Sequence, residues 1–276
     1  MYRNNPSRTS RSGLTLLELV VVMTILIALA GLLVALFPGM LRYAHTSTGA
    51  TNMPELNKIF HMHHQTQRGW PNYLDNLVSG SSLYARLPGY QVGHGYYLEA
   101  YQLNEEQADA LHEAGLTHVF NLTDHEVSDA TFDCYGPDYP AAPPLIAAIP
   151  VEAGMTVARL VHEHDIEKFK GDLDHVYVVF GVGQATPLVG PGGMMQDAPI
   201  HFDDAAGTRP NEVYSRFVAV FDLGDAHDHE EGEEYGHGHH HGHGSAKFVT
   251  VAALHRSGIA VPWMPLRGFH DADHSH

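Results

Sequence analysis

Seven histidines gather in one short segment late in the chain. Between Asp225 and Gly244 the sequence mixes imidazoles with carboxylates and glycines. The histidines are His227, His229, His237, His239, His240, His241 and His243. Neutral imidazole is a good ligand for Zn, Cu and Ni, and the acidic neighbours add anionic oxygens. Because the many glycines leave the segment too flexible to fix one geometry, we predict loose binding of several ions, weakening as the pH falls through the histidine range.

Two other interpretations fit this His-rich loop, which with its flank covers residues 225–246. One is a disordered, solvated insertion with incidental metal affinity. The other is a pH-sensitive patch, because imidazoles protonated below about pH 6.5 offset the surrounding carboxylates. The end of the chain adds more residues of the same types, namely His270, Asp271, Asp273, His274 and His276. None of the interpretations requires a cofactor.

Histidines also cluster in two places outside the His-rich loop. His61, His63 and His64 lie in a segment with helical periodicity, and His162 and Asp165 have the i, i+3 spacing of neighbours on a helix. A His-Glu-x-x-His zinc-protease pattern is absent from the sequence. The favoured interpretation of both clusters is therefore an exposed polar face.

Sequence motifs for covalent or phosphate chemistry are also absent. The sequence has no Gly-x-Ser-x-Gly elbow, no Walker loop and no paired Cys-x-x-Cys. Its single cysteine, Cys134, excludes an intramolecular disulfide and favours the role of a small buried apolar residue. We therefore predict that the protein is not an enzyme.

The charge balance restricts the class of partner. The chain has 276 residues with Lys+Arg 15 and Asp+Glu 32, a formal net charge of −17. Phosphate backbones are bound by clustered Lys and Arg, so no nucleic-acid partner is expected. So acidic a chain is expected to be soluble and to attract cations.

The first element that the sequence predicts is a long apolar stretch near the N-terminus. Twelve polar residues, three of them Arg, precede Gly13, and an apolar run whose one charge is Glu18 extends to Phe37. At about 1.5 Å per residue this run is long enough to cross a hydrocarbon core of roughly 30 Å. The basic flank predicts a cytoplasmic N-terminus, with everything after Pro38 on the extracytoplasmic side.

The sequence around Gly13 resembles the N-terminus of type IV pilins and of the pseudopilins of type II secretion systems. In that family a prepilin peptidase cuts after the Gly and methylates the new N-terminal amine, and the buried Glu pairs with the amine of a neighbouring subunit. The resemblance implies cleavage after Gly13, N-methylation of Leu14 and an assembly role for Glu18. Leu14 departs mildly from the pattern, since Phe is commonest there. An unpaired carboxylate in lipid costs free energy, and it becomes tolerable when a cation pairs with it.

Three alternatives explain less of this stretch. A secretory signal would be cut at Ala28-Leu29-Ala30, but the apolar run continues beyond that site. A plain single-span anchor accounts for the length and orientation but not for Gly13 and Glu18. A buried helix of a soluble domain would be shorter or would carry a polar face.

The chain is therefore expected to have four parts. These are a leader (1–13), a transmembrane and assembly helix (14–37), a continuation of that helix (38–69) and an extracytoplasmic head (70–276). The continuation is expected to break between residues 38 and 51, where Pro38-Gly39 and poor helix formers occur, to resume at Asn52 and to stop at Gly69.

Periodicity and end signals predict the elements of the head. Helices are expected at 104–115 and 155–170, and strands at 117–122, 175–182, 216–223 and 247–254. The last two strands flank the His-rich loop and predict an antiparallel hairpin. The expected fold class is α+β, with a long membrane-spanning, pilin-like N-terminal helix followed by a globular head with an antiparallel β-sheet and a disordered His-rich loop.

The function that the resemblance implies is that of a pilin-like or pseudopilin-like structural subunit of a type IV pilus or type II secretion filament. The expected partners are the prepilin peptidase, other pilin or pseudopilin subunits in a homo- or hetero-filament, and the bacterial inner membrane. The expected location is single-pass in that membrane with a periplasmic head, or in the pilus or pseudopilus. The alternative is a membrane-tethered extracytoplasmic protein that binds Zn, Cu or Ni through the His-rich loop.

Overall fold

The structure, a computed structural model, describes residues 16–90, 96–122, 148–201, 213–225, 244–256 and 258–263, and for residues 32–50 and 121 it describes the backbone alone. The chain divides into two compact units, Met1–Ala44 and His45–His276. The first helix, α1, runs through both.

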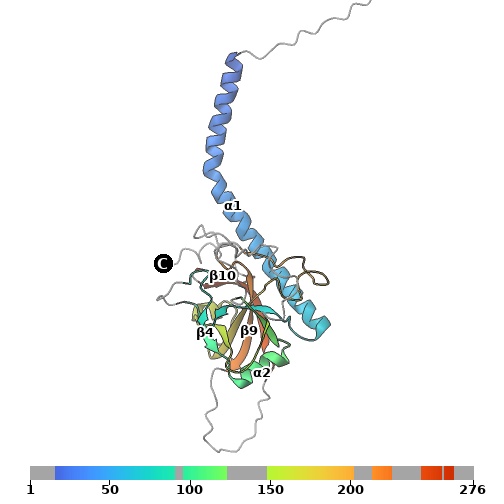
Figure 1. Cartoon of the computed structure of the whole chain (residues 1–276). Helices are drawn as coiled ribbons and strands as arrows, with labels where there is room; N and C mark the ends of the chain where they lie inside the picture. The colour runs from blue at the N-terminus through green and yellow to red at the C-terminus, as the bar shows by residue number, and fades with distance from the viewer. Residues whose placement is uncertain are drawn as a thin grey trace, which may run out of the picture. The chain divides into compact units, whose positions relative to one another are not determined.

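Helix α1 covers Leu16–Gln67, 52 residues (Figure 1). Its backbone is helical throughout residues 38–51, so the predicted interruption there is wrong. A proline inside a helix removes one hydrogen bond and bends the axis without having to end it. The helix ends close to the predicted stop: Arg68 takes a positive φ of 59° and its N–H donates to the His64 carbonyl at 2.9 Å.

The predicted fold class, which includes a membrane-spanning N-terminal helix, and the predicted location in the inner membrane are wrong. Within the described residues, none of the helices is both long and apolar enough to cross a bilayer. In the later turns, Met53, Leu56 and Phe60 are buried in the core of the second unit.

The second unit is built around one large sheet with few helices. Nine strands run in the order β11-β10-β9-β8-β1-β5-β6, with β7 beside β8 and β4 beside β7. The strands are β1 (Leu74–Asn76), β4 (Leu98–Gln102), β5 (His118–Asn121), β6 (Ala148–Pro150), β7 (Thr156–Leu160), β8 (His175–Gly181), β9 (Phe217–Asp225), β10 (Lys247–His255) and β11 (Gly258–Ala260). All pairs are antiparallel except β1 with β5. A separate hairpin joins β2 (Val78–Ser79) to β3 (Ser82–Leu83).

The three late strands and one helix confirm the sequence predictions. β9 and β10 pair as the predicted antiparallel hairpin, and β8 flanks β9. The helix α2 (Glu105–Glu113) starts at a capping box in which Asn104 and Gln107 satisfy each other's backbone N–H groups. The predicted helix at 155–170 is wrong, because its first residues form β7 between β4 and β8, and only α3 (Glu163–Glu167) is helical.

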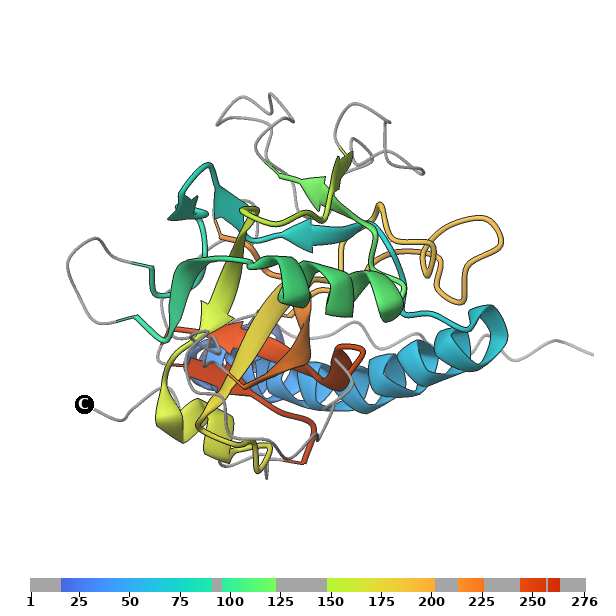
Figure 2. The same cartoon turned by 90° about the horizontal axis from the view of Figure 1, so that it is seen from below.

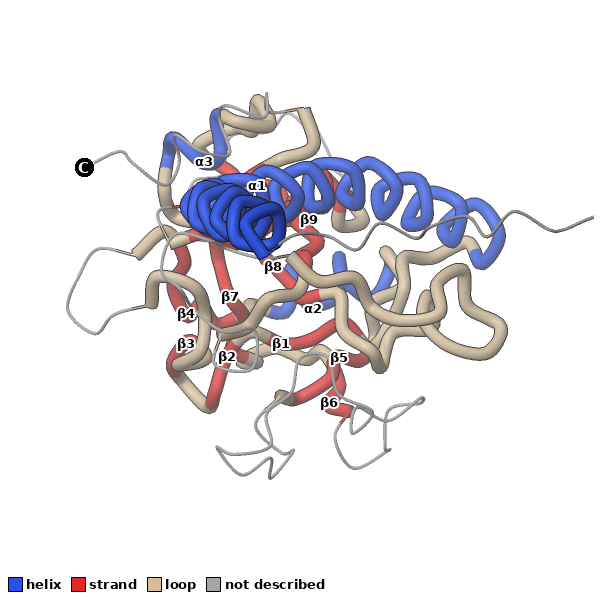
Figure 3. Tube along the Cα trace, turned by 90° about the horizontal axis from the view of Figure 1, so that it is seen from above, coloured by secondary structure: helices blue, strands red, loops and turns tan. Residues whose placement is uncertain are grey.

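Two apolar cores cover the two faces of the sheet. One contains the later turns of α1 and the buried face of α2, packed on Phe217, Ala219 and Phe221 of β9. The other contains Ile166 of α3, together with the alternate residues of β9, Val218 and Val220. Figures 2 and 3 both show the later turns of α1 running along the sheet of the second unit.

Candidate functional site

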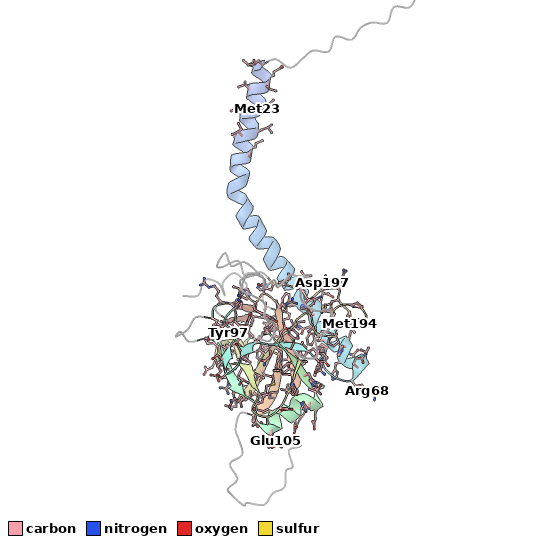
Figure 4. The ribbon with its side chains drawn as sticks, in the orientation of Figure 1. Met23, Arg68, Tyr97, Glu105, Met194 and Asp197 are labelled. Carbon is pink, nitrogen blue, oxygen red and sulfur yellow. The ribbon has the colours of Figure 1, made fainter. Side chains whose placement is uncertain are left out.

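The first turns of α1 carry a continuous set of exposed apolar side chains. The fraction of each that solvent reaches runs from 48% for Val21 to 81% for Leu16. The members are Leu16, Leu17, Leu19, Val20, Val21, Val22, Met23, Ile25, Leu26, Ile27 and Leu29; Figure 4 labels Met23 among them. Single exposed apolar residues are ordinary, whereas a contiguous apolar surface marks a place where another molecule binds.

Glu18 is the one predicted processing or assembly residue that the structure describes. It lies, exposed, in the first turn of α1, where the helix dipole stabilises a carboxylate. Gly13 and Leu14, the predicted cleavage and methylation positions, lie outside the described residues. The structure therefore places a carboxylate at the start of the exposed apolar surface.

The His-rich loop has a described root at the end of the β9–β10 hairpin. The seven histidines lie outside the described residues, but β9 ends at Asp225 and β10 begins at Lys247. Beside this root, the His175 Nδ1 atom of β8 lies 3.0 Å from each carboxylate oxygen of Asp222. Its Nε2 atom lies 3.3 Å from Asp225 Oδ1. One imidazole thus bridges the two carboxylates at the end of β9.

The electrostatics of this root favour the charged form of His175. Burial by itself lowers the pKa of the imidazole. The hydrogen bond to Asp222 and the negative charges of Asp222, Asp172 and Asp225 outweigh burial, so the pKa of His175 is raised above its ordinary value. Both ring nitrogens can then donate, one to each aspartate.

The other histidine clusters make contacts within the second unit. His64 stacks on Trp70 with ring centroids 4.2 Å apart, and His61 meets the same indole edge-on. His63 Nδ1 lies 3.1 Å from the Gly69 carbonyl. In α3 the buried Asp165 carboxylate is held by Lys168 at 2.5 Å, with His162 at 3.4 Å.

No group of three His, Cys, Asp or Glu residues in the described ranges is arranged to hold a metal ion. At the root of the loop this has a simple reason, because both nitrogens of His175 are already engaged by carboxylates. Binding of Zn, Cu or Ni by the His-rich loop stays a prediction about residues outside the described ranges.

A buried polar cluster that the sequence does not predict lies in the core of the second unit. The Tyr214 hydroxyl donates to Asp75 Oδ2 at 2.6 Å inside the core. Burial raises the pKa of Asp75 to about 6, even though the Arg216 charge and the Tyr214 hydrogen bond act to lower it. The available signal was an acidic residue between the apolar residues Leu74 and Leu77, but its partner is 139 positions away.

Two glycines make room for this cluster. A Cβ atom at Gly181 would lie 1.7 Å from the Tyr214 hydroxyl oxygen, and one at Gly183 would lie 2.0 Å from Asp75 Oδ1. Such distances are far inside van der Waals contact, so both positions must be glycine for the carboxylate and the phenol to meet. The cluster joins β1 to the segment that leads into β9.

Comparisons with protein-family models, with curated proteins and with solved structures found no match to this chain. The likeness to pilins therefore depends on the residues around Gly13 and Glu18.

Proposed function

We propose that the chain is a pilin-like or pseudopilin-like structural subunit that assembles through the N-terminal part of α1. The observation that carries the proposal is the exposed apolar surface of residues 16–29, directly after the Gly13–Glu18 motif. Fully burying an aliphatic side chain contributes about 1.5–3 kcal/mol, so packing this surface against copies of itself supplies a strong driving force for assembly.

Glu18 gives this assembly its register. A carboxylate that enters an apolar interface is costly unless a cation neutralises it. Under the proposal a prepilin peptidase cuts after Gly13, and the new amine of Leu14 in a neighbouring subunit pairs with Glu18. Subunits that are out of register leave the charge unpaired, so the aligned arrangement is favoured.

Cross-linking between copies tests the proposal. Cys134 is changed to Ser, and a single cysteine is placed in turn at Val20, Val21, Val22 and Ile27 of the full chain, expressed in its native host. We expect thiol cross-links between copies whose yield follows the 3.6-residue period of a helix, because one face meets a neighbour. Equal yields at all four positions indicate non-specific association and contradict the proposal.

Two controls separate assembly from misfolding. A cysteine at Glu113, exposed on α2, is expected to give no cross-link between copies. In the Ile27→Cys background, Glu18→Ala is expected to reduce the cross-linked fraction without changing the thermal unfolding of the sheet unit. A cross-linked fraction unaffected by Glu18→Ala would remove Glu18 from the mechanism.

A further inference from the structure

A hollow of about 580 Å³ lies between the end of α1 and the loop of residues 187–194. This volume falls within the range of ligand pockets. His63, Gln67 and Arg68 line it from the helix, Trp70 from the segment that follows, and Gly193 and Met194 from the loop. All of these residues belong to the second compact unit.

The charge of this hollow differs from that of the chain. Arg68 lines it and no carboxylate does, although the chain carries a net charge of −17. Among the described residues, Arg68 has no ion pair or side-chain hydrogen bond with a neighbour. The guanidinium therefore keeps all its donors for a ligand, and a guanidinium can bind a carboxylate through two parallel hydrogen bonds.

His63 adds a neutral polar group rather than a second charge. Its Nδ1 atom lies 3.1 Å from the Gly69 carbonyl, and because a carbonyl only accepts, Nδ1 carries the hydrogen. Burial, partly offset by that hydrogen bond, lowers the pKa of His63, so the imidazole is neutral at neutral pH. Arg68 is thus the cation that a ligand meets.

Two residues that line the hollow, Gly193 and Arg68, have unusual backbone environments. A Cβ atom at Gly193 would lie 2.5 Å from the Leu188 carbonyl oxygen, so the loop can fold back only with glycine there. Arg68 itself takes a φ of 59°, a conformation that suits Gly or Asn better than Arg.

A second hollow of about 620 Å³ continues past the same loop. It shares Gly193 and Met194 with the first and is lined by Asp197. Figure 4 shows Asp197, Met194 and Arg68 in that order along one side of the sheet unit. The combined surface offers an acid at one end, a flexible thioether in the middle and a guanidinium at the other end.

We propose that these two hollows bind an extended peptide segment that carries an acidic side chain, with the carboxylate at Arg68 and the neighbouring residues lying across Met194. The inference does not depend on filament assembly, because every residue that carries it lies in the second unit.

Trp70 provides the readout, because it lines the first hollow and the chain has only one other tryptophan. The full chain carrying Trp263→Phe is titrated with the blocked peptide acetyl-Ala-Ala-Glu-Ala-Ala-amide, and with the same peptide containing Gln in place of Glu. We expect saturable change in Trp70 fluorescence, with binding of the Glu peptide roughly tenfold to a hundredfold tighter. The difference shrinks with added salt.

Arg68→Asn is the decisive variant, because Asn suits the left-handed backbone and removes the charge. It is expected to abolish the preference for the Glu peptide, whereas Lys58→Gln, which removes an exposed cation outside the hollow, preserves it. Glutarate, a carboxylate without a peptide chain, is expected to bind more weakly. Equal binding of the Glu and Gln peptides, an unchanged preference in Arg68→Asn, or glutarate binding as tightly as the Glu peptide each overturns the proposal.

Discussion

His175 and Asp222 form a pair in which one imidazole nitrogen lies 3.0 Å from both oxygens of the carboxylate. The pair joins β8 to β9 where β9 leads into the His-rich loop. Because the same imidazole also reaches Asp225, it holds the last residues of β9 against β8.

Replacing His175 is expected to change the pH dependence of stability. The pKa of His175 is raised in the folded state, so its contribution is fully present below the ordinary histidine value, about 6.5, and is lost as the pH rises through the raised pKa. We expect His175→Gln to cost about 1 kcal/mol near pH 6 and close to nothing at pH 9. Urea unfolding of the wild type and of His175→Gln at both pH values measures this difference in the free energy of unfolding.

The matched control is His164→Gln, an exposed histidine 4.0 Å from Glu167. It is expected to leave the free energy of unfolding unchanged at both pH values. A loss in His175→Gln that is the same at pH 6 and pH 9 would show that packing, rather than the ion pair, accounts for the effect.

Gly183→Ala is expected to destabilise the sheet unit by about 3 kcal/mol or more, because the added methyl would lie 2.0 Å from Asp75 Oδ1 in a closed core. Gly244→Ala is the control, since a Cβ there meets nothing within 4 Å. Thermal unfolding of the two variants provides the comparison. Equal melting temperatures would contradict the described arrangement of Asp75.

Tyr214→Phe removes the hydrogen bond to Asp75 and is expected to cost about 1–3 kcal/mol. The cost should be larger at pH 8 than at pH 5, because a hydroxyl bound to an ionised carboxylate makes the stronger bond. Tyr90→Phe, whose ring packs edge-on against Tyr96, is the control and should have little effect. A pH-independent cost would show that Asp75 does not change its protonation over this range.

Asp75 should also make the wild-type protein less stable as the pH rises. Its folded pKa of about 6 lies above the ordinary value of about 3.9. The stabilising contribution is thus fully present below pH 3.9 and is lost as the pH passes through 6, by as much as about 3 kcal/mol. Unfolding free energies of Asp75→Asn across pH 4–8 should lack this slope.

The His-rich loop is expected to bind several Ni or Zn ions per chain, because its seven imidazoles supply ligands without fixing one site. Isothermal titration with Zn at pH 7.5 and at pH 5.5 should show binding at the higher pH alone. Deleting residues 226–243 should abolish binding while the melting temperature of the sheet unit is preserved. Zn binding that survives the deletion would place the ligands elsewhere.

The sequence predicted those elements whose signals are local. β8, β9 and β10 consist of β-branched and aromatic residues, and Asn104 caps α2 through residues three positions away. The segment 155–170 was mispredicted because Thr156–Leu160 pairs with β4 and β8, a tertiary requirement that overrides helical spacing.

The sites followed the same division. The motif from Gly13 to Glu18 and the His-rich loop are contiguous in the sequence, so both could be proposed from it, and both stay predictions. The Asp75–Tyr214 pair and the hollow beside Arg68 join segments far apart in the sequence, so neither could be found without the fold. The membrane-spanning helix was predicted from the length of an apolar run, whereas none of the helices within the described residues is long and apolar enough to cross a bilayer.

The most direct test of the proposed function is the N-terminal mass of the protein isolated from its native host. The proposed function predicts a chain that begins at Leu14, as cleavage after Gly13 requires, and that carries one methyl group on its amine. A chain that keeps Met1 and the residues up to Gly13, or one that begins at Gly31, would contradict it.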